Sequence, residues 1–323
     1  MDSEVKKEEK QATDCEMLSA ELRRMITNIT NRNELASTSN KCQSEGHIDT
    51  LELNNLPRSD GMIFSIACRP GTMDYDFYFE KRDLDVITVT CQQVIDDRMI
   101  WKETFQTPET ADNFACFVLQ RIMTKYGKKI RALTVRGDLF DFDWNAIGTL
   151  ENFETLNVGH DKQAECLIAK TKLPLKTLSV GMARIGKEKL SANLARVEKV
   201  FSTDNVLLPN TIFNSEQFDR LQATFIYLPV GNIEAQSIVK FINKWKQGQM
   251  REDFRKLKLF WEEADQFDIR KIFNSIGVSI VVPSKIFEVH QLPPSSKTAD
   301  FKYSTLRNHH EILFEVQNPD FLD

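Results

Sequence analysis

Three short segments near the middle of the chain repeat one pattern of apolar and polar positions. "IRALTVRG" begins at Ile130, "FETLNVG" at Phe153 and "LKTLSVG" at Leu175, so their first residues are 23 and then 22 positions apart. Each segment reads apolar-x-x-Leu-x-Val. A period of about 20–29 residues with this spacing is typical of leucine-rich repeats, in which each unit adds one short strand to a shared core.

The pattern continues less regularly on both sides of these segments. "VEKVFS" from Val197 keeps two of the three apolar positions, "FDRLQA" from Phe218 or "LQATFI" from Leu221 would come next, and "FRKLKLFW" from Phe254 follows. An earlier "IDTLEL" from Ile48 also fits, although it lies outside the run and chance is the alternative explanation. The segments "FDWNAIGTL", "KQAECLIAK" and "KEKLSANLA" could cross back as helices.

We therefore predict an α/β fold, in which a small N-terminal helical module is followed by an irregular leucine-rich-repeat-like α/β solenoid. The alternative is a doubly wound α/β sheet, whose units usually exceed about 30 residues. From Met62 to Phe105, strand patterns separated by turn residues predict a small meander. The predicted divisions are a disordered tail over 1–14, the helical module over 15–47 and a recognition domain over 62–316.

Composition and charge narrow the class of protein. The net charge of −5 argues against a nucleic-acid partner, because such partners are bound mainly through contacts of basic side chains with phosphates. No apolar run approaches the length of a membrane span, and the first fourteen residues lack the apolar core of a signal peptide. Six scattered cysteines without a CxxC pair are typical of reduced thiols. We expect a protein of the cytoplasm or the nucleus, without a membrane or nucleic-acid partner.

Motifs that carry catalysis or bind cofactors do not stand out. No GxGxxG, Walker loop or GxSxG occurs, and the adjacent His309 and His310 would point to opposite faces of a strand. The acidic cluster of Asp138, Asp141 and Asp143 is interpreted as a soluble loop with a helix cap, and a divalent-ion site is the alternative. We predict no catalytic residue, metal or cofactor. The alternative to this prediction is an enzyme whose motifs are not recognised.

The segment "LSAELRRMITNITNRNELASTSNKC" from Leu18 to Cys42 resembles an F-box, the helical module that docks on the Skp-type adaptor of cullin–RING ubiquitin ligases. Ser19 stands where that family usually has proline, and no tryptophan follows Cys42. The residues that match the family pattern are Leu18, Glu21, Leu22, Ile26, Glu34, Leu35 and Cys42. The apolar residues that would contact the adaptor are Leu18, Leu22, Ile26, Ile29 and Leu35.

A second segment, "VGNIEAQSIVKFINKWKQGQMREDFRKLKLFW" from Val230 to Trp261, is similar to the F-box-associated domain, type 2, of nematode-expanded F-box proteins. The matching positions are Phe241, Ile242, Trp245, Gly248, Leu257 and Leu259. Independently of the resemblance, Ile238, Phe241, Ile242 and Trp245 fall on one helical face, and Gly248 is a natural stop.

The two resemblances together imply a non-catalytic substrate receptor of a Skp–cullin–F-box ubiquitin ligase. The alternative is an interaction scaffold whose F-box no longer binds the adaptor. Residues between the core positions of each unit should face solvent, where cations around exposed phenylalanines would form a typical binding hot spot. The predicted target-binding residues are Arg136, Asn157, Phe201, Lys256, Lys258 and Phe260.

Overall fold

A computed structural model gives the fold of the larger of two units into which the chain divides, 1–46 and 47–323. All described residues lie in the second unit, so the F-box-like segment falls outside them. The described residues are 48–58, 61–69, 73–81, 87–95, 98–107, 119–120, 123, 130–136, 144, 147–182, 190–262, 267–293, 297–306 and 309–317.

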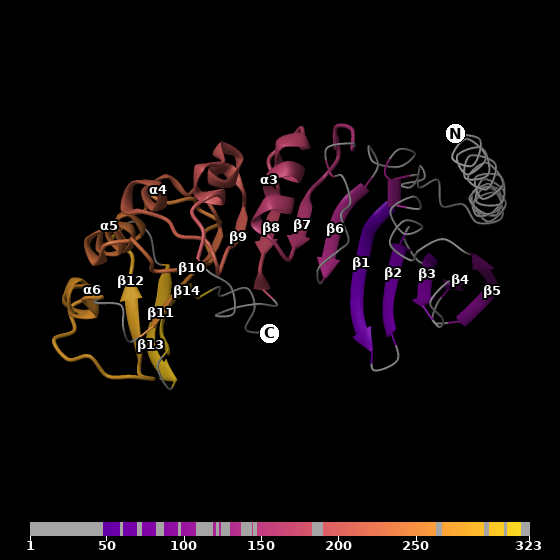
Figure 1. The fold of residues 1–323 in the computed structure, drawn as a ribbon. Helices are drawn as coiled ribbons and strands as arrows, with labels where there is room; N and C mark the ends of the chain where they lie inside the picture. The colour runs from indigo at the N-terminus through magenta and orange to yellow at the C-terminus, as the bar shows by residue number, and fades with distance from the viewer. Residues whose placement is uncertain are drawn as a thin grey trace, which may run out of the picture. The chain divides into compact units, whose positions relative to one another are not determined.

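One open sheet organises this unit, and its strand order is β12-β13-β14-β11-β10-β9-β8-β7-β6-β1-β2-β3-β4-β5 (Figure 1). The strands are β1 Ile48–Arg58, β2 Gly61–Arg69, β3 Met73–Lys81, β4 Ile87–Ile95, β5 Arg98–Thr107, β6 Ile130–Arg136, β7 Thr155–Val158, β8 Thr177–Val180, β9 Asn205–Leu207, β10 Phe225–Pro229, β11 Lys256–Glu262, β12 Ile286–His290, β13 Thr298–Leu306 and β14 His309–Val316.

The repeated segments form neighbouring parallel strands, which confirms the prediction for β6, β7 and β8. Leu133 pairs with Leu156, and Leu156 pairs with Leu178. The same register extends to both sides and makes one buried row across seven parallel strands: Leu51, Leu133, Leu156, Leu178, Val206, Ile226 and Leu257. A second buried row lies two residues further along each unit: Leu53, Val135, Val158, Val180, Leu208, Leu228 and Leu259.

The early "IDTLEL" segment belongs to this series, so chance is the wrong explanation for it. It forms β1, which pairs in parallel with β6 and places Leu51 beside Leu133 and Leu53 beside Val135. The predicted meander is also present as the antiparallel strands β2 to β5. These strands extend the sheet beyond β1. They lie between β1 and β6 in the sequence, although β1 and β6 are neighbours in the sheet.

Two of the later repeats were predicted in the wrong place. "VEKVFS" is not a strand, because Glu198–Ser202 forms the 3₁₀ helix η5, and "FDR" belongs to helix α4 (Ser215–Arg220). The units instead begin at Thr203 and Ala223, which are both 1 % exposed. The first residues of successive units, from Leu175 to Phe254, are therefore spaced unevenly, by 28, 20 and 31 positions.

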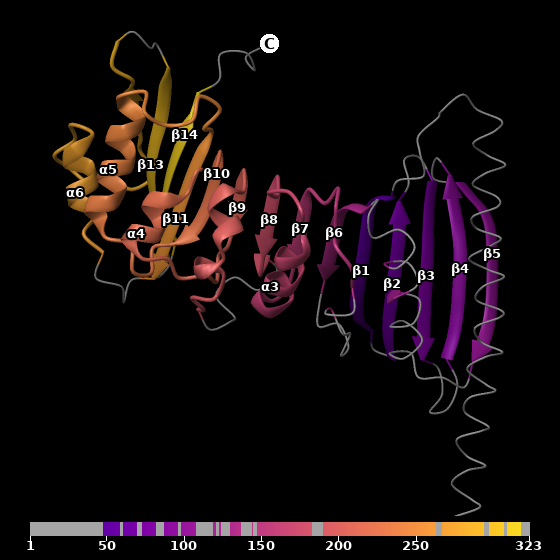
Figure 2. The same ribbon diagram turned by 90° about the horizontal axis from the view of Figure 1, so that it is seen from above.

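All helices in the described ranges lie on one face of the sheet (Figures 1 and 2). They are α3 Asp161–Lys170, η4 Leu194–Arg196, η5, α4, α5 Ala235–Lys246 and α6 Ile269–Ser275. Helix α3 forms from the predicted "KQAECLIAK" and buries Ala164, Leu167 and Ile168, whereas the described part of "KEKLSANLA" contributes only to η4. A doubly wound sheet carries helices on both faces, so this arrangement differs from the alternative.

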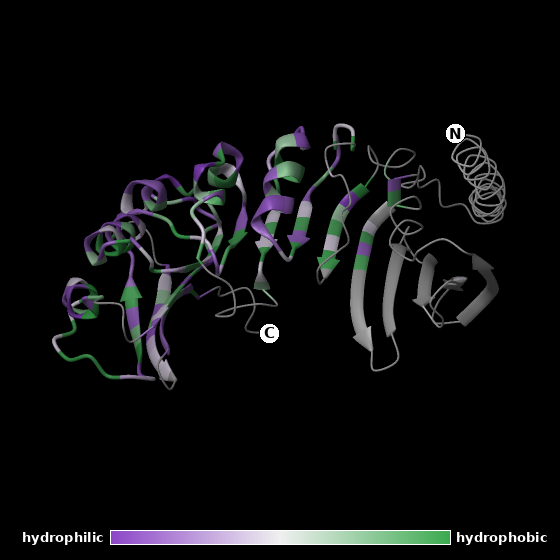
Figure 3. Ribbon diagram, viewed as in Figure 1, coloured by the Kyte–Doolittle hydropathy of each residue, from purple (hydrophilic) through white to green (hydrophobic). Residues whose placement is uncertain are grey.

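Helix α5 is formed as its sequence predicts. Its buried face includes Ile238, Phe241, Ile242 and Trp245, and hydropathy alternates around the helix in Figure 3. The helix stops at Gly248, which has a φ of +68° and whose N–H donates to the carbonyl of Trp245 at 2.9 Å. Glycine adopts this left-handed conformation without the steric cost that a side chain brings.

The C-terminal strands change the sheet from parallel to antiparallel. Strand β14 pairs with β11, and β13 and β12 follow as further antiparallel neighbours. Helix α6 covers them through Phe273, whose ring lies 5.4 Å from the rings of both Phe287 and Phe301. In the described part of the chain, no helix is long and apolar enough to cross a membrane.

Candidate recognition surface

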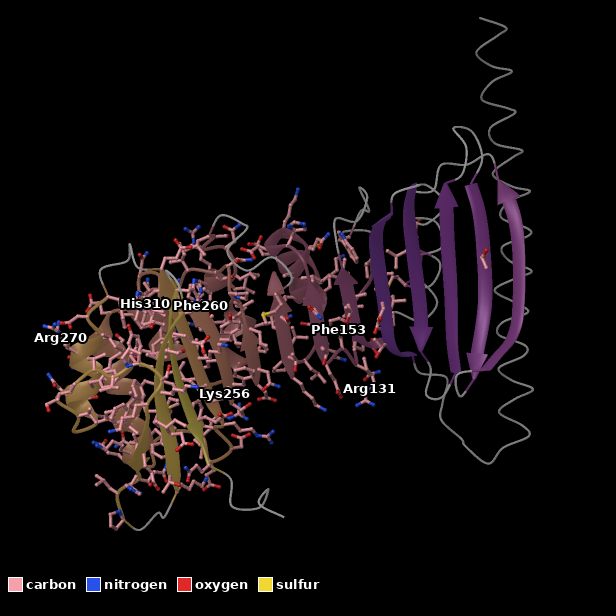
Figure 4. All side chains as sticks on the ribbon, turned by 90° about the horizontal axis from the view of Figure 1, so that it is seen from below. Arg131, Phe153, Lys256, Phe260, Arg270 and His310 are labelled. Atoms are coloured by element: carbon pink, nitrogen blue, oxygen red, sulfur yellow. The ribbon has the colours of Figure 1, made fainter. Side chains whose placement is uncertain are left out.

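The face of the sheet opposite the helices is the candidate recognition surface, here called the open face. Side chains alternate between the two faces of a strand, so the neighbours of the buried leucines point to the open face. Figure 4 views the sheet from the side opposite to Figure 2 and labels Lys256 and Phe260 on β11. Arg131 and Phe153, also labelled there, lie at the β6 and β7 part of the sheet.

The open face of β10, β11 and β14 carries a compact group of rings and charges. The ring centroids of Tyr227 and Phe260 lie 5.2 Å apart, and the ring of His309 stacks on Phe260 at 5.3 Å. The ammonium of Lys258 lies 5.0 Å from the centre of the Tyr227 ring and 2.8 Å from a carboxylate oxygen of Glu311. We call Tyr227, Lys258, Phe260, His309 and Glu311 the aromatic–charged cluster.

The environment of Tyr227 shows that the cluster is partly shielded from solvent. Its side chain is 8 % exposed, and burial raises the pKa of the phenol. The negative charge of Glu311 raises the pKa further, because it disfavours a second negative charge nearby. The phenol is therefore neutral at physiological pH and can act as a hydrogen-bond donor to a bound partner.

The predicted lysines are present on the open face, but each has a carboxylate partner. Lys256 forms an ion pair with Glu315 at 2.9 Å and Lys258 forms one with Glu311. Both glutamates come from β14, which lies beside β11. The predicted cations are therefore paired, and the strands display alternating positive and negative groups.

The two predicted phenylalanines are not exposed. Phe260 is 6 % exposed, because the rings of Tyr227 and His309 cover it on the open face. Phe201 is also 6 % exposed and belongs to η5 rather than to a strand. The guanidinium carbon of Arg220 lies 4.0 Å from the centre of the Phe201 ring, so this aromatic is capped by a cation from α4.

Smaller polar side chains line the open face of the middle strands. Asn157 on β7 pairs across the sheet with Thr134 and Ser179, and it is half-buried. On β9, the amide of Asn205 donates to the hydroxyl of Thr177 at 3.1 Å. Arg136 is the last residue of β6, and its side chain lies outside the described part. The predicted Asn157 therefore lies on the same face as the lysines but several strands away from them.

The adjacent histidines point to opposite faces, as the sequence predicts. His309 stacks on Phe260, whereas His310 lies on the helix-covered face, where its ring is 5.4 Å from Trp261. The Nδ1 atom of His310 is 2.7 Å from the hydroxyl oxygen of Tyr303, and burial raises the pKa of that phenol. Trp261 is 5 % exposed and belongs to the core.

A separate groove of about 640 Å³ lies beside Phe201, between η5, the end of α4 and the loop after α5. Its charged side chains are mostly paired: Arg220 with Glu198 at 2.6 Å, and Arg251 with Asp204 at 2.7 Å. The groove thus resembles a solvated surface of balanced charge.

Other predicted positions fall outside the described residues. These include the adaptor-contact residues Leu18, Leu22, Ile26, Ile29 and Leu35, and the acidic residues Asp138, Asp141 and Asp143. Among the residues that are described, no group of three or more His, Cys, Asp or Glu side chains is arranged to hold a metal ion.

Sequence reasoning missed four members of the open face: Tyr227, His309, Glu311 and Glu315. The alternation in "HHEILFEV" predicts a strand whose odd-numbered residues share a face, but it does not reveal which strand lies beside it. The pairing of Lys256 with Glu315 joins residues 59 positions apart.

Comparisons of the chain with protein-family models, with curated proteins and with solved structures found no match.

Proposed function

We propose that this protein is a non-catalytic substrate receptor of a Skp–cullin–F-box ubiquitin ligase, and that the open face binds the target protein. The observation that carries the proposal is the aromatic–charged cluster on a sheet face that no described helix covers. Aromatic and charged side chains together are the usual chemistry of binding hot spots. The F-box resemblance of the segment from Leu18 to Cys42 supports the adaptor half of the proposal.

The protein would act by holding two other proteins close together. A receptor that binds the adaptor at one module and the target at another raises the effective concentration of the target near the charged enzyme. We further infer that the seven parallel strands form an irregular leucine-rich-like solenoid. The two buried rows in continuous register support this inference, because neighbouring units of a solenoid share one core.

The adaptor half predicts that Leu22→Glu and Ile26→Glu abolish co-purification with a Skp-type adaptor. Each change would bring an unpaired charge into an apolar contact, which is costly. The measurement is a pull-down of the full chain with purified adaptor. The Lys258→Glu variant is the control and should bind the adaptor normally. A folded wild-type chain that does not bind the adaptor at micromolar concentration would favour the scaffold with an inactive F-box.

The target half predicts that a Lys256→Glu, Lys258→Glu variant keeps its fold and its adaptor binding but loses bound targets. The variant replaces two half-exposed ion pairs, each worth at most about 1 kcal/mol, with like-charge contacts that cost a similar amount, which is small enough for the sheet to stay folded. The same change also reverses the charge pattern that a target would meet, which should weaken complementary binding. The measurement is quantitative proteomic capture compared with the wild type.

A matched control for this experiment is available on the other face. The Lys240→Glu, Lys244→Glu variant makes the same two charge reversals on α5, which packs on the helix-covered face. It should recover the wild-type set of targets. If both variants lose the same targets, the effect is one of net charge, and the open face is not the specific binding surface.

A further inference from the structure

Strand β12 ends the sheet that the described strands form, and among these strands it pairs with β13 alone. An edge strand presents a row of backbone donors and acceptors without partners, and it can pair with a strand from another chain. The direction of these groups on β12 follows from one hydrogen bond: the N–H of Gln291 donates to the carbonyl of Lys297 at 3.0 Å. Hydrogen-bonded pairs alternate along an antiparallel ladder, so the backbone N–H and C=O groups of Phe287 and Val289 also point toward β13.

The backbone groups of Ile286, Glu288 and His290 consequently point away from the sheet. The side chains of the same three residues lie on the open face and are exposed, whereas Val289 is buried at 4 % exposure on the helix-covered face. The edge thus offers a short run of backbone groups flanked by charged and apolar side chains.

Exposed apolar side chains concentrate in the chain segment that contains this edge strand. Six large apolar residues are exposed among the described ones, and four of them lie between residues 280 and 292. These four are Ile280 at 68 %, Val282 at 37 %, Ile286 at 55 % and Leu292 at 55 %. Exposed apolar residues that gather in one place mark a surface for association, whereas scattered ones need no explanation.

We propose that β12 pairs with β12 of a second copy of this chain, antiparallel and around a two-fold axis at Val289. Within one chain the Nε2 atom of His290 lies 3.9 Å from a carboxylate oxygen of Glu288. In this register Glu288 also lies opposite His290 of the partner subunit, and the symmetry repeats the pair, so the four groups come together at the axis. The exposed side chains of Ile286 and Leu292 then flank the paired stretch at both ends, outside the pairs that Glu288 and His290 form. A two-fold interface must be complementary to itself, and this segment is.

The neighbouring registers lack this complementarity. An axis at Glu288 places the two carboxylates directly opposite one another, and like charges in that position are destabilising. An axis at Phe287 places the apolar Ile286 against the charged Glu288. The N–H of Leu292 already donates to the carbonyl of Lys246, which ends the free edge and limits the pairing to a short stretch. A dimer held by so short a pairing is weak and should dissociate on dilution.

The test is sedimentation velocity of the full chain over a series of concentrations, and it is independent of adaptor and target binding. The wild type should approach twice the monomer mass as its concentration rises. Glu288→Lys should raise the dissociation constant about tenfold, since both contacts between a Glu288 carboxylate and the imidazole of the partner's His290 are lost. The double variant Glu288→Lys, His290→Glu should restore the wild-type value, because it places a lysine opposite a glutamate at both positions.

Two further variants separate pairing from general effects. His290→Pro removes an outward-facing N–H and should abolish the dimer, while an edge strand tolerates proline at such a position; far-UV circular dichroism would verify the fold. Glu216→Lys changes an exposed charge on α4 and should leave the dimer unchanged. A wild type that stays monomeric at all concentrations, or a double variant as weak as Glu288→Lys, would overturn the proposal. Pairing of β12 with an extended segment of another protein instead would do so as well.

Discussion

Trp245→Ala is expected to lower the free energy of unfolding by about 3–5 kcal/mol, the usual cost of truncating a large buried aromatic. Trp245 is 2 % exposed and lies near the end of α5, where its ring meets Phe314 of β14 edge-on at 5.0 Å. The change removes the contact between α5 and β14 that this ring pair makes. Urea denaturation followed by circular dichroism measures the loss.

Gln236→Ala is the control for this change. Gln236 lies in the first turn of the same helix and is exposed, so its truncation should alter the free energy of unfolding by no more than about 0.5 kcal/mol. A loss below about 1 kcal/mol for Trp245→Ala would mean that α5 does not pack on β14 through this side chain.

The parts of the fold that could be predicted from the sequence are those in which buried residues recur at a regular spacing. Strands β6, β7 and β8 each place a leucine and a valine at the buried positions, and α5 places its apolar residues at helical spacing. Both patterns follow from the geometry of the elements themselves. They needed no knowledge of which segments lie side by side.

The failures came where a core position is not obviously apolar. Thr203 occupies the first position of its unit and is 1 % exposed, and its hydroxyl donates to the carbonyl of Lys199 at 3.0 Å. A buried polar group that is hydrogen-bonded costs little, so threonine can occupy a position where the other units have a large apolar residue. Ala223 fills the next first position with a small side chain. A search for large apolar residues therefore selected Val197 and Phe218 instead.

The candidate site was harder to predict than the fold, because its chemistry depends on strand order. Alternation correctly assigned Lys256 and Lys258 to one face of β11. It could not show that β14 lies beside β11 and brings Glu311 and Glu315 to the same face. A strip that is cationic in the sequence is consequently a ladder of ion pairs in the structure. A target that binds there should present both signs of charge and a group that contacts the aromatic rings.

Leu156→Ala tests whether the buried leucine row is continuous, and it should lower the free energy of unfolding by about 2–5 kcal/mol. Leu156 is fully buried between Leu133 and Leu178 on the two neighbouring parallel strands. Because each unit of the proposed solenoid packs chiefly on its neighbours, a cavity at this position weakens two interfaces at once. Asn157→Ala on the open face of the same strand is the control, and it should cost less than about 1 kcal/mol. Denaturant titration of both variants makes the comparison, and a loss below about 0.5 kcal/mol for Leu156→Ala would show that this leucine is not part of the core.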